Sequence, residues 1–118
     1  MNCGLGSSDK YKNIQKNLAI VCNKIKATSK EIFLLNQVHS SKFYYISKHS
    51  KLHKKFVGDA LVTDRKNMPI AVLTADCAPI LIYDENKEMV AAVHAGWKGA
   101  YKGIIKKVIK FMIKKGCS

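Results

Sequence analysis

The sequence predicts an α/β or α+β fold in which two helices flank a mixed sheet. Apolar residues recur at helical spacing in residues 9–26 and again in residues 98–115. Between these segments lie short runs rich in Ile, Val and Leu, which are typical of strands. A chain of 118 residues is long enough for one domain with a buried core.

The first helix is expected over residues 9–26, with Ser8 or Asp9 as its N-terminal cap. Its apolar stripe comprises Tyr11, Ile14, Leu18, Val21 or Cys22, and Ile25. Because Cys22 belongs to this stripe, we interpret it as a packed thiol.

The segment after this helix predicts further strands. Residues 32–38 and 42–47 each have strand composition, and we expect them to pair as a hairpin around Ser40 and Ser41. Another short strand is expected within residues 56–64.

The spacing of the His and Cys residues along the chain matches no compact metal motif. His49 and His53 stand four residues apart, but residues 48–55 lack an apolar stripe and predict an exposed loop. The four cysteines include no C-x-x-C pair, so we expect reduced thiols rather than disulfides or a zinc finger.

The central segment, IAVLTADCAPILIYD at residues 70–84 with VAAVHAGWKG at 90–99, carries the best functional pattern. Its apolar runs predict strands buried on both faces, namely residues 70–74, 80–83 and 90–93, with a turn at 85–88. Asp76 and Cys77 follow the first run, and His94 follows the third. Because sites in α/β sheets usually form at strand ends, we expect the functional site here.

A second helix is expected over residues 98–115, after Gly96 and Gly99, and Gly116 should end it. Its apolar stripe comprises Tyr101, Ile104, Ile105, Val108, Phe111 and Met112.

His39, Cys77 and His94 share one property: each comes at the end of a predicted strand. Two imidazoles and a thiolate are a suitable ligand set for catalytic zinc, which keeps a fourth position open and lowers the pKa of bound water to about 7. The same residues allow a second chemistry, with Cys77 as nucleophile and His94 or His39 as its base. Asp76 would then orient a histidine or a ligand.

The HAGWKG turn predicts an anion site beside His94. Glycines at a strand-to-helix turn let backbone N–H groups approach an anion, and Lys98 adds a positive charge that suits phosphate. The alternative is that Gly96 and Gly99 only permit close packing of the helix.

The formal net charge of +13 makes a basic nucleic-acid-binding fragment an alternative function. All basic residues except Arg65 are lysines, however, and they are spread along the chain. Since nucleic-acid readers favour Arg, we expect a solvated lysine surface and no nucleic-acid partner. No run reaches the roughly 18 apolar residues of a membrane span, and residues 1–10 lack a secretory signal, so we expect a cytoplasmic protein without a membrane partner.

Four motifs occur in one order along the chain: NQVHS, GDALVTD, LTADCAPILIYD and AAVHAGWKG, at residues 36–40, 58–64, 73–84 and 91–99. Together they resemble the multicopper polyphenol oxidase (laccase-like) family, whose members are regarded as zinc-dependent purine nucleoside phosphorylases. NCGLGSSD at residues 2–9 resembles the segment that precedes the family's first helix. The resemblance implies the laccase-domain fold, which is shared with a Cys-hydrolase-like deamidating toxin domain.

What the resemblance implies for the site follows from the matching positions. His39, Cys77 and His94 match the family's zinc ligands, and copper is the alternative metal that gave the family its older name. The implied substrates are phosphate and adenosine, inosine, guanosine or methylthioadenosine, with adenosine deamination as a further activity. We expect Cys77, His94 and Asp76 to be catalytic.

Three further positions complete the expected site. Gly96, Lys98 and Asp59 are expected to bind phosphate or substrate, and Asp59, Asp76 and Lys98 to lie near the ligands, either supporting them or facing the substrate. Family members are considerably longer than this chain. We therefore expect residues 1–118 to form a partial laccase-like domain without the family's N-terminal edge and C-terminal part. An inactive remnant, or a subunit completed by a partner chain or by self-association, is the alternative.

Overall fold

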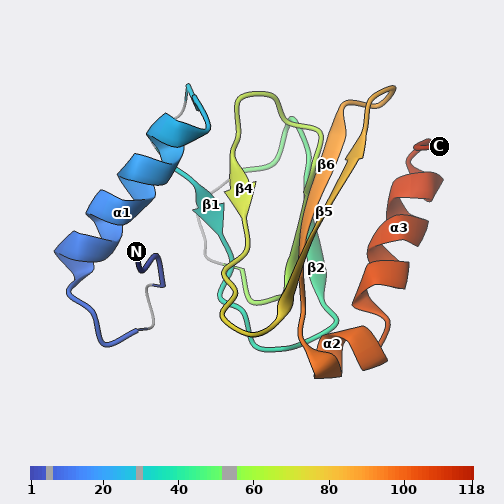
Figure 1. The fold of residues 1–118 in the computed structure, drawn as a ribbon. Coiled ribbons are helices and arrows are strands. Elements are labelled where there is room, and N and C mark those ends of the chain that lie inside the picture. The colour runs from blue at the N-terminus through green and yellow to red at the C-terminus, as the bar shows by residue number, and fades with distance from the viewer. Residues whose placement is uncertain (5–6, 29–30, 52–55) are drawn as a thin grey trace. The chain divides into compact units, whose positions relative to one another are not determined.

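The computed structural model describes residues 1–4, 7–28, 31–51 and 56–118. It forms two compact units: Met1–Phe33 with Asn67–Pro69, and Leu34–Lys66 with Ile70–Ser118. Figure 1 shows the elements of both units in chain order. Among the described residues, no helix is both long enough and apolar enough to cross a membrane.

The first unit contains helix α1 (Tyr11–Lys24) within the range expected from the sequence. Ile14 and Cys22 are its buried residues, which confirms Cys22 as a packed thiol. The capping prediction was wrong: Lys10 is the N-cap and makes no side-chain cap bond. The Asp9 carboxylate accepts the Lys10 N–H at 2.8 Å instead.

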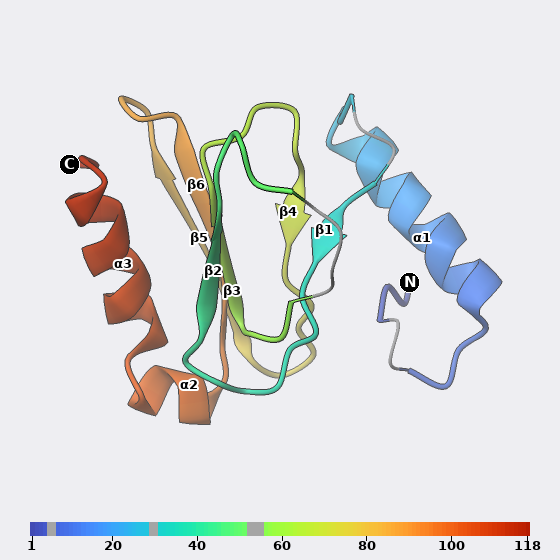
Figure 2. The same ribbon diagram turned by 180° about the vertical axis from the view of Figure 1, so that it is seen from behind.

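The second unit is built on a mixed sheet, as predicted, and this sheet has four strands. Its strands are β2 (Phe43–Ile46), β3 (Ala60–Thr63), β5 (Ala78–Asp84) and β6 (Met89–Ala95), in the order β2-β3-β6-β5. Strands β2 and β3 run parallel, whereas β6 is antiparallel to both of its neighbours. Figure 2 shows β2 beside β3 at one side of this sheet. Strands β5 and β6 form a hairpin through the expected turn at residues 85–88.

The predicted hairpin between residues 32–38 and 42–47 was wrong. Strand β1 (Phe33–Leu34) pairs with β4 (Ile70–Ala71), and β2 pairs with β3, with Phe43 opposite Ala60. The connecting residues are bound by a buried carboxylate rather than folded into a hairpin turn, as described below. Strands β1 and β4 are also much shorter than the apolar runs that predicted them.

The predicted helix 98–115 is two helices, α2 (Trp97–Tyr101) and α3 (Ile104–Lys114). The helix is interrupted at Gly103, whose φ of 76° lies in the left-handed region that glycine adopts without steric cost. Tyr101 does not belong to the apolar stripe, because the break leaves its side chain 90% exposed. Gly116 follows α3 with a φ of 103°, so the predicted stop is confirmed.

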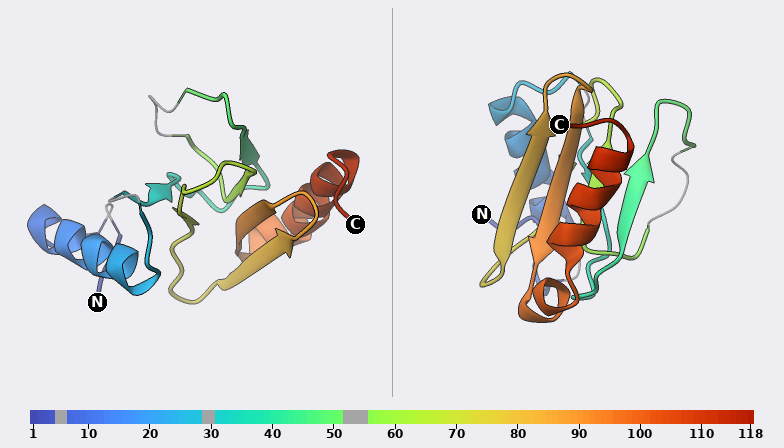
Figure 3. Two further views of the ribbon diagram at one scale, coloured as in Figure 1. Left: turned by 90° about the horizontal axis from the view of Figure 1, so that it is seen from above. Right: turned by 90° about the vertical axis from the view of Figure 1, so that its right-hand side faces the viewer.

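The core of the second unit lies between the sheet and α3. The right panel of Figure 3 shows α3, in red, in front of one face of this sheet. Ile104, Val108 and Met112 of α3 pack against inward-facing residues of β3 and β6. Strand β6 is largely buried, as expected. The prediction that β5 is buried on both faces was wrong: β5 is an edge strand, and Leu81 and Tyr83 are 79% and 63% exposed.

Tyr45 of β2 should lose its proton only at high pH. Burial, the hydrogen bond of 2.8 Å that its hydroxyl donates to Asp64, and the charge of that carboxylate raise the pKa of Tyr45 to about 12. Because the folded-state pKa is raised, this group's stabilising contribution is complete below pH ~10 and is lost as the pH rises toward 12. Ultraviolet titration should show one late phenolate that Tyr45→Phe removes; a Tyr45→Phe curve with the late phase intact would contradict the assignment.

Candidate metal centre

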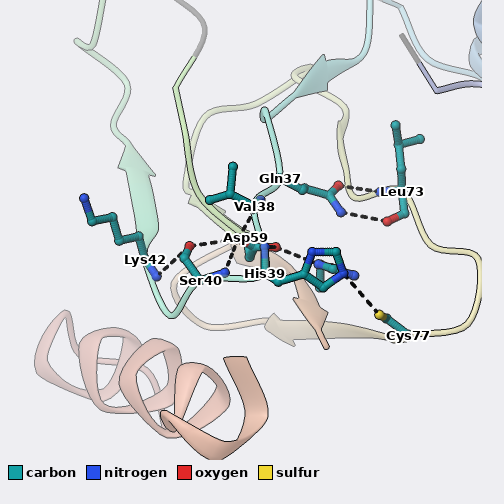
Figure 4. A network of polar contacts seen from close by, with 9 residues as sticks. Gln37, Val38, His39, Ser40, Lys42, Asp59, Leu73 and Cys77 are labelled. Atoms are coloured by element: carbon teal, nitrogen blue, oxygen red, sulfur yellow. Dashed lines mark hydrogen bonds and ion pairs between the residues drawn. The ribbon is translucent and has the colours of Figure 1, made fainter. Parts of the chain in front are cut away.

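Three predicted ligand residues, His39, Cys77 and His94, converge in the second unit. Their ligand atoms all lie within 4.8 Å of one another. The Cys77 Sγ is 3.8 Å from the His39 Nε2, and the two imidazole rings meet edge to face with centroids 5.0 Å apart. Figure 4 shows His39 and Cys77 facing each other from separate segments.

The three side chains come from different kinds of backbone. His39 lies in the loop before β2, Cys77 directly precedes β5, and His94 lies inside β6 near its end. Strands β5 and β6 are paired next to this site, with Pro79 opposite His94. The antiparallel pairing therefore brings the start of β5 to the end of β6, and with it Cys77 to His94.

A single buried carboxylate, Asp59, binds both histidine segments. Its Oδ1 accepts the N–H of Val38 at 3.2 Å, and the N–H and hydroxyl of Ser40 at 2.7 and 2.8 Å. Its Oδ2 accepts the N–H of His39 at 3.0 Å and lies 2.7 Å from the His94 Nδ1. Burial opposes ionisation, but the hydrogen bonds from His94 and from the Ser40 and Val38 groups outweigh it, so the pKa of Asp59 lies below its ordinary value.

The loop that carries His39 is held in an uncommon conformation. His39 has a φ of 58°, in the left-handed region that residues other than glycine rarely adopt. A second contact fixes this loop: the Gln37 side chain accepts the N–H of Leu73 and donates to its carbonyl, both at 2.7 Å. Gln37 and Leu73 thereby join the segment before His39 to the segment before Cys77, as Figure 4 shows.

Gly96 packs directly against the three ligand residues. A Cβ built on Gly96 would lie 2.8 Å from the His39 ring, 3.4 Å from the Cys77 Sγ and 3.7 Å from the His94 ring. Gly99, one turn later, approaches the Ser40 carbonyl so closely that a Cβ would lie 2.7 Å from the oxygen. Both glycines therefore permit close packing around the cluster. This matches the second of the two interpretations of the HAGWKG turn, in which Gly96 and Gly99 allow the helix to pack closely.

The donor set fits the metal that the sequence predicts. Zinc binds Cys thiolate and His nitrogen, and three protein ligands with a remaining open position are typical of catalytic zinc. Thiolate with imidazole also suits copper, so these residues could hold a metal ion but do not select between zinc and copper. With its Nδ1 against Asp59, His94 presents its Nε2 to the cluster.

Comparison with known proteins identifies the family. A family model described as multi-copper polyphenol oxidoreductase laccase matches residues 1–118, the whole chain. The chain belongs to this laccase family.

Curated relatives of this laccase-family chain include proteins named purine nucleoside phosphorylase. The chain is 44% identical over 80 residues to one from Clostridium acetobutylicum, which covers 68% of this chain and 33% of the relative. It is 46% identical over 92 residues to one from Aquifex aeolicus, covering 77% of this chain and 43% of the relative. The chain thus spans less than half the length of these two relatives.

Solved structures show the same fold. A Bacillus licheniformis protein called YfiH superposes with a TM-score of 0.84 at 27% identity, over 97% of this chain and 45% of its own length. A Neisseria meningitidis protein of the DUF152 family superposes with a TM-score of 0.80 at 32% identity, over 94% of this chain and 44% of its own. The expected laccase-domain fold is therefore confirmed.

Of the remaining expected site residues of the laccase-family chain, Gly96 and Asp59 contact the ligand residues, whereas Asp76 and Lys98 are exposed. Asp76 is exposed and makes no hydrogen bond or ion pair with another described residue. Lys98 is exposed, and its ammonium lies 5.5 Å from the centre of the Trp97 ring. Asp59 is 0% exposed, so it faces the ligands and not the solvent from which a substrate would arrive.

Sequence reasoning missed several groups that shape the site. Gln37 and Ser40 belong to the NQVHS motif, but the motif does not reveal them as loop anchors, because their partners are backbone groups and a distant carboxylate. Asp59 was expected beside the ligands or facing the substrate, and it lies beside the ligands, where it binds His94 and the loop. A signal was present: an acidic residue directly before the fully buried strand β3 needs internal partners. His53 lies outside the described residues, and His49 is exposed.

Proposed function

We propose that this chain carries the zinc centre of a purine nucleoside phosphorylase that splits adenosine, inosine, guanosine or methylthioadenosine with phosphate. The observation that carries the proposal is the convergence of His39, Cys77 and His94 from three distant segments. The names of the curated relatives support the same activity. Zinc held by these residues would supply a Lewis acid at the place where the substrate binds.

In this reaction an oxygen of phosphate bonds to the ribose C1′ while the bond from C1′ to the purine nitrogen breaks. The electron pair stays with the base, which takes up a proton, and the products are the free base and ribose 1-phosphate, or 5-methylthioribose 1-phosphate from methylthioadenosine. The exposed ammonium of Lys98 would attract the phosphate by charge. Gly96 stands two residues before Lys98 and packs against His39 and Cys77, so it joins the segment of the lysine to the ligands.

The exposed carboxylate of Asp76 is assigned to the nucleoside. Asp76 directly precedes Cys77 and makes no competing bond with a described residue, so its oxygens are available to accept hydrogen bonds from a bound ligand. In this proposal Cys77 and His94 hold the zinc next to the bound substrate.

Zinc-loaded chain should release base and ribose 1-phosphate from at least one of the four nucleosides, and only when phosphate is present. Cys77→Ala should lose both stoichiometric zinc and product formation, because it removes the one thiolate of the cluster. Cys3→Ala, a free cysteine outside the cluster, is the matched control and should keep both. Metal analysis of the same samples distinguishes zinc from copper.

Other outcomes point to the alternatives. Inosine formed from adenosine without phosphate would reveal deamination instead. Full zinc occupancy with no product would reject phosphorolysis by this chain alone and favour an inactive remnant or a subunit completed by a partner. Equal zinc content in wild type and Cys77→Ala would overturn the metal centre itself.

A further inference from the structure

We infer that Asp59 is the positioning residue of the metal centre, and that it sets both histidine ligands at once by fixing the tautomer of His94 and the loop of His39. The inference rests on the metal centre proposed above but not on the reaction. It follows from the hydrogen bonds of the two Asp59 oxygens: Oδ1 accepts from Val38 and Ser40, and Oδ2 contacts His39 and His94.

The first effect concerns the tautomer of His94. An ionised carboxylate only accepts hydrogen bonds, so at 2.7 Å from the Asp59 Oδ2 the His94 Nδ1 must carry the proton. A neutral imidazole has one protonated and one unprotonated nitrogen, so Nε2 has a free lone pair. That lone pair lies on the side of His39 and Cys77, where a metal ligand is needed.

The second effect concerns the backbone of His39. The N–H groups of three consecutive residues, Val38, His39 and Ser40, all point at the same carboxylate. These bonds compensate the left-handed φ of 58° at His39, which is unfavourable for a side chain with a Cβ. The Ser40 hydroxyl adds a fourth donor at 2.8 Å. The loop that presents the His39 imidazole is therefore ordered by Asp59.

An asparagine at position 59 would fit the space but reverse one of these effects. Three donors from Val38 and Ser40 face Oδ1, so the amide oxygen would occupy that side. The amide NH₂ would then replace Oδ2 and face the His39 N–H and the His94 Nδ1. An NH₂ group can only donate to an unprotonated Nδ1, which moves the His94 proton to Nε2 and blocks the ligand position.

The test combines a spectroscopic signature with zinc binding. In metal-free wild type, two-bond proton–nitrogen correlation spectra of labelled histidine should show the Nδ1–H tautomer of His94. Asp59→Asn should show the Nε2–H tautomer and bind zinc about 10–100-fold more weakly in competition with a chromogenic chelator, the usual cost of losing a group that orients a metal ligand. Hydrogen exchange of the amides of residues 38–40 should also become faster in the variant.

Asp84→Asn is the matched control. Asp84 is also buried and accepts backbone N–H bonds from Lys87 and Ser118, but it contacts none of the metal ligands. It should lower the melting temperature while leaving zinc affinity and the His94 tautomer unchanged, which separates positioning from a general loss of stability.

Two results would overturn the inference: an Nε2–H tautomer of His94 in metal-free wild type, or wild-type zinc affinity in Asp59→Asn. The first needs no variant, so it stands even if Asp59→Asn does not fold. Neither depends on catalysis. Normal zinc binding without phosphorolysis would count against the proposed function and leave the role of Asp59 intact.

Discussion

Gly96→Ala is expected to lower the zinc affinity of the chain on the order of 100-fold, the upper end of the usual cost of disturbing the shell around metal ligands. The new methyl carbon would lie 2.8 Å from the His39 ring, a separation that real Cβ atoms essentially never show. The backbone itself accepts alanine, because Gly96 has a φ of −69°. The loss therefore comes from displacement of the His39 imidazole away from Cys77 and His94.

Gly103→Ala provides the control for this substitution. A Cβ at Gly103 meets no atom within 4 Å, but the φ of 76° is strained for alanine and should cost about 1–2 kcal/mol of stability. For Gly103→Ala we expect reduced thermal stability and unchanged zinc affinity. For Gly96→Ala we expect the main loss in zinc affinity. Chelator competition and thermal melting distinguish them; equal zinc affinity in both variants would show that the contact with His39 is not critical.

Ile104→Ala is expected to have the largest effect on stability, about 2–5 kcal/mol. Ile104 is 0% exposed at the start of α3 and belongs to the core cluster between that helix and the sheet. Its truncation removes buried apolar surface and leaves a cavity that α3 can only partly close. Denaturant unfolding measures the change.

Ile113→Ala is the matched comparison on the same helix, because Ile113 is 57% exposed. We expect a change within about 0.5 kcal/mol, as for most surface positions. Similar losses in the two variants would mean that α3 does not pack on the sheet through the Ile104 face.

The types of element could be predicted from the sequence because periodicity reports burial. The stripe of α1 marks its buried side, and the apolar run of β6 marks a largely buried strand, whereas the run of β5 predicted more burial than this edge strand has. Strand pairing was harder to predict. The turn between residues 38 and 43 lacks the residues typical of a hairpin turn, and its conformation is set by hydrogen bonds to a carboxylate 20 residues away. The helix break at Gly103 was also missed, because a single glycine within a periodic stripe does not interrupt the pattern.

The site was predicted as a set of ligand types but not as a network. His39, Cys77 and His94 could be selected because ligand-type residues next to apolar runs are uncommon in buried strands. The groups that orient them act through backbone amides, as Gln37 and Ser40 do, and such contacts leave no trace in composition or spacing. They become visible only when residues far apart in the chain are placed together.

The wide separation of the three ligands has a thermodynamic consequence. An ion held by them would cross-link the chain, closing one loop from His39 to Cys77 and another from Cys77 to His94. The unfolded chain offers no such preformed arrangement, so binding energy would be added to the folded state alone. At free ion 100 times above its dissociation constant, that amounts to about 2.7 kcal/mol. The melting temperature of this chain would then rise with the free metal concentration. A chelator would lower it by removing the stabilisation that the bound ion supplies.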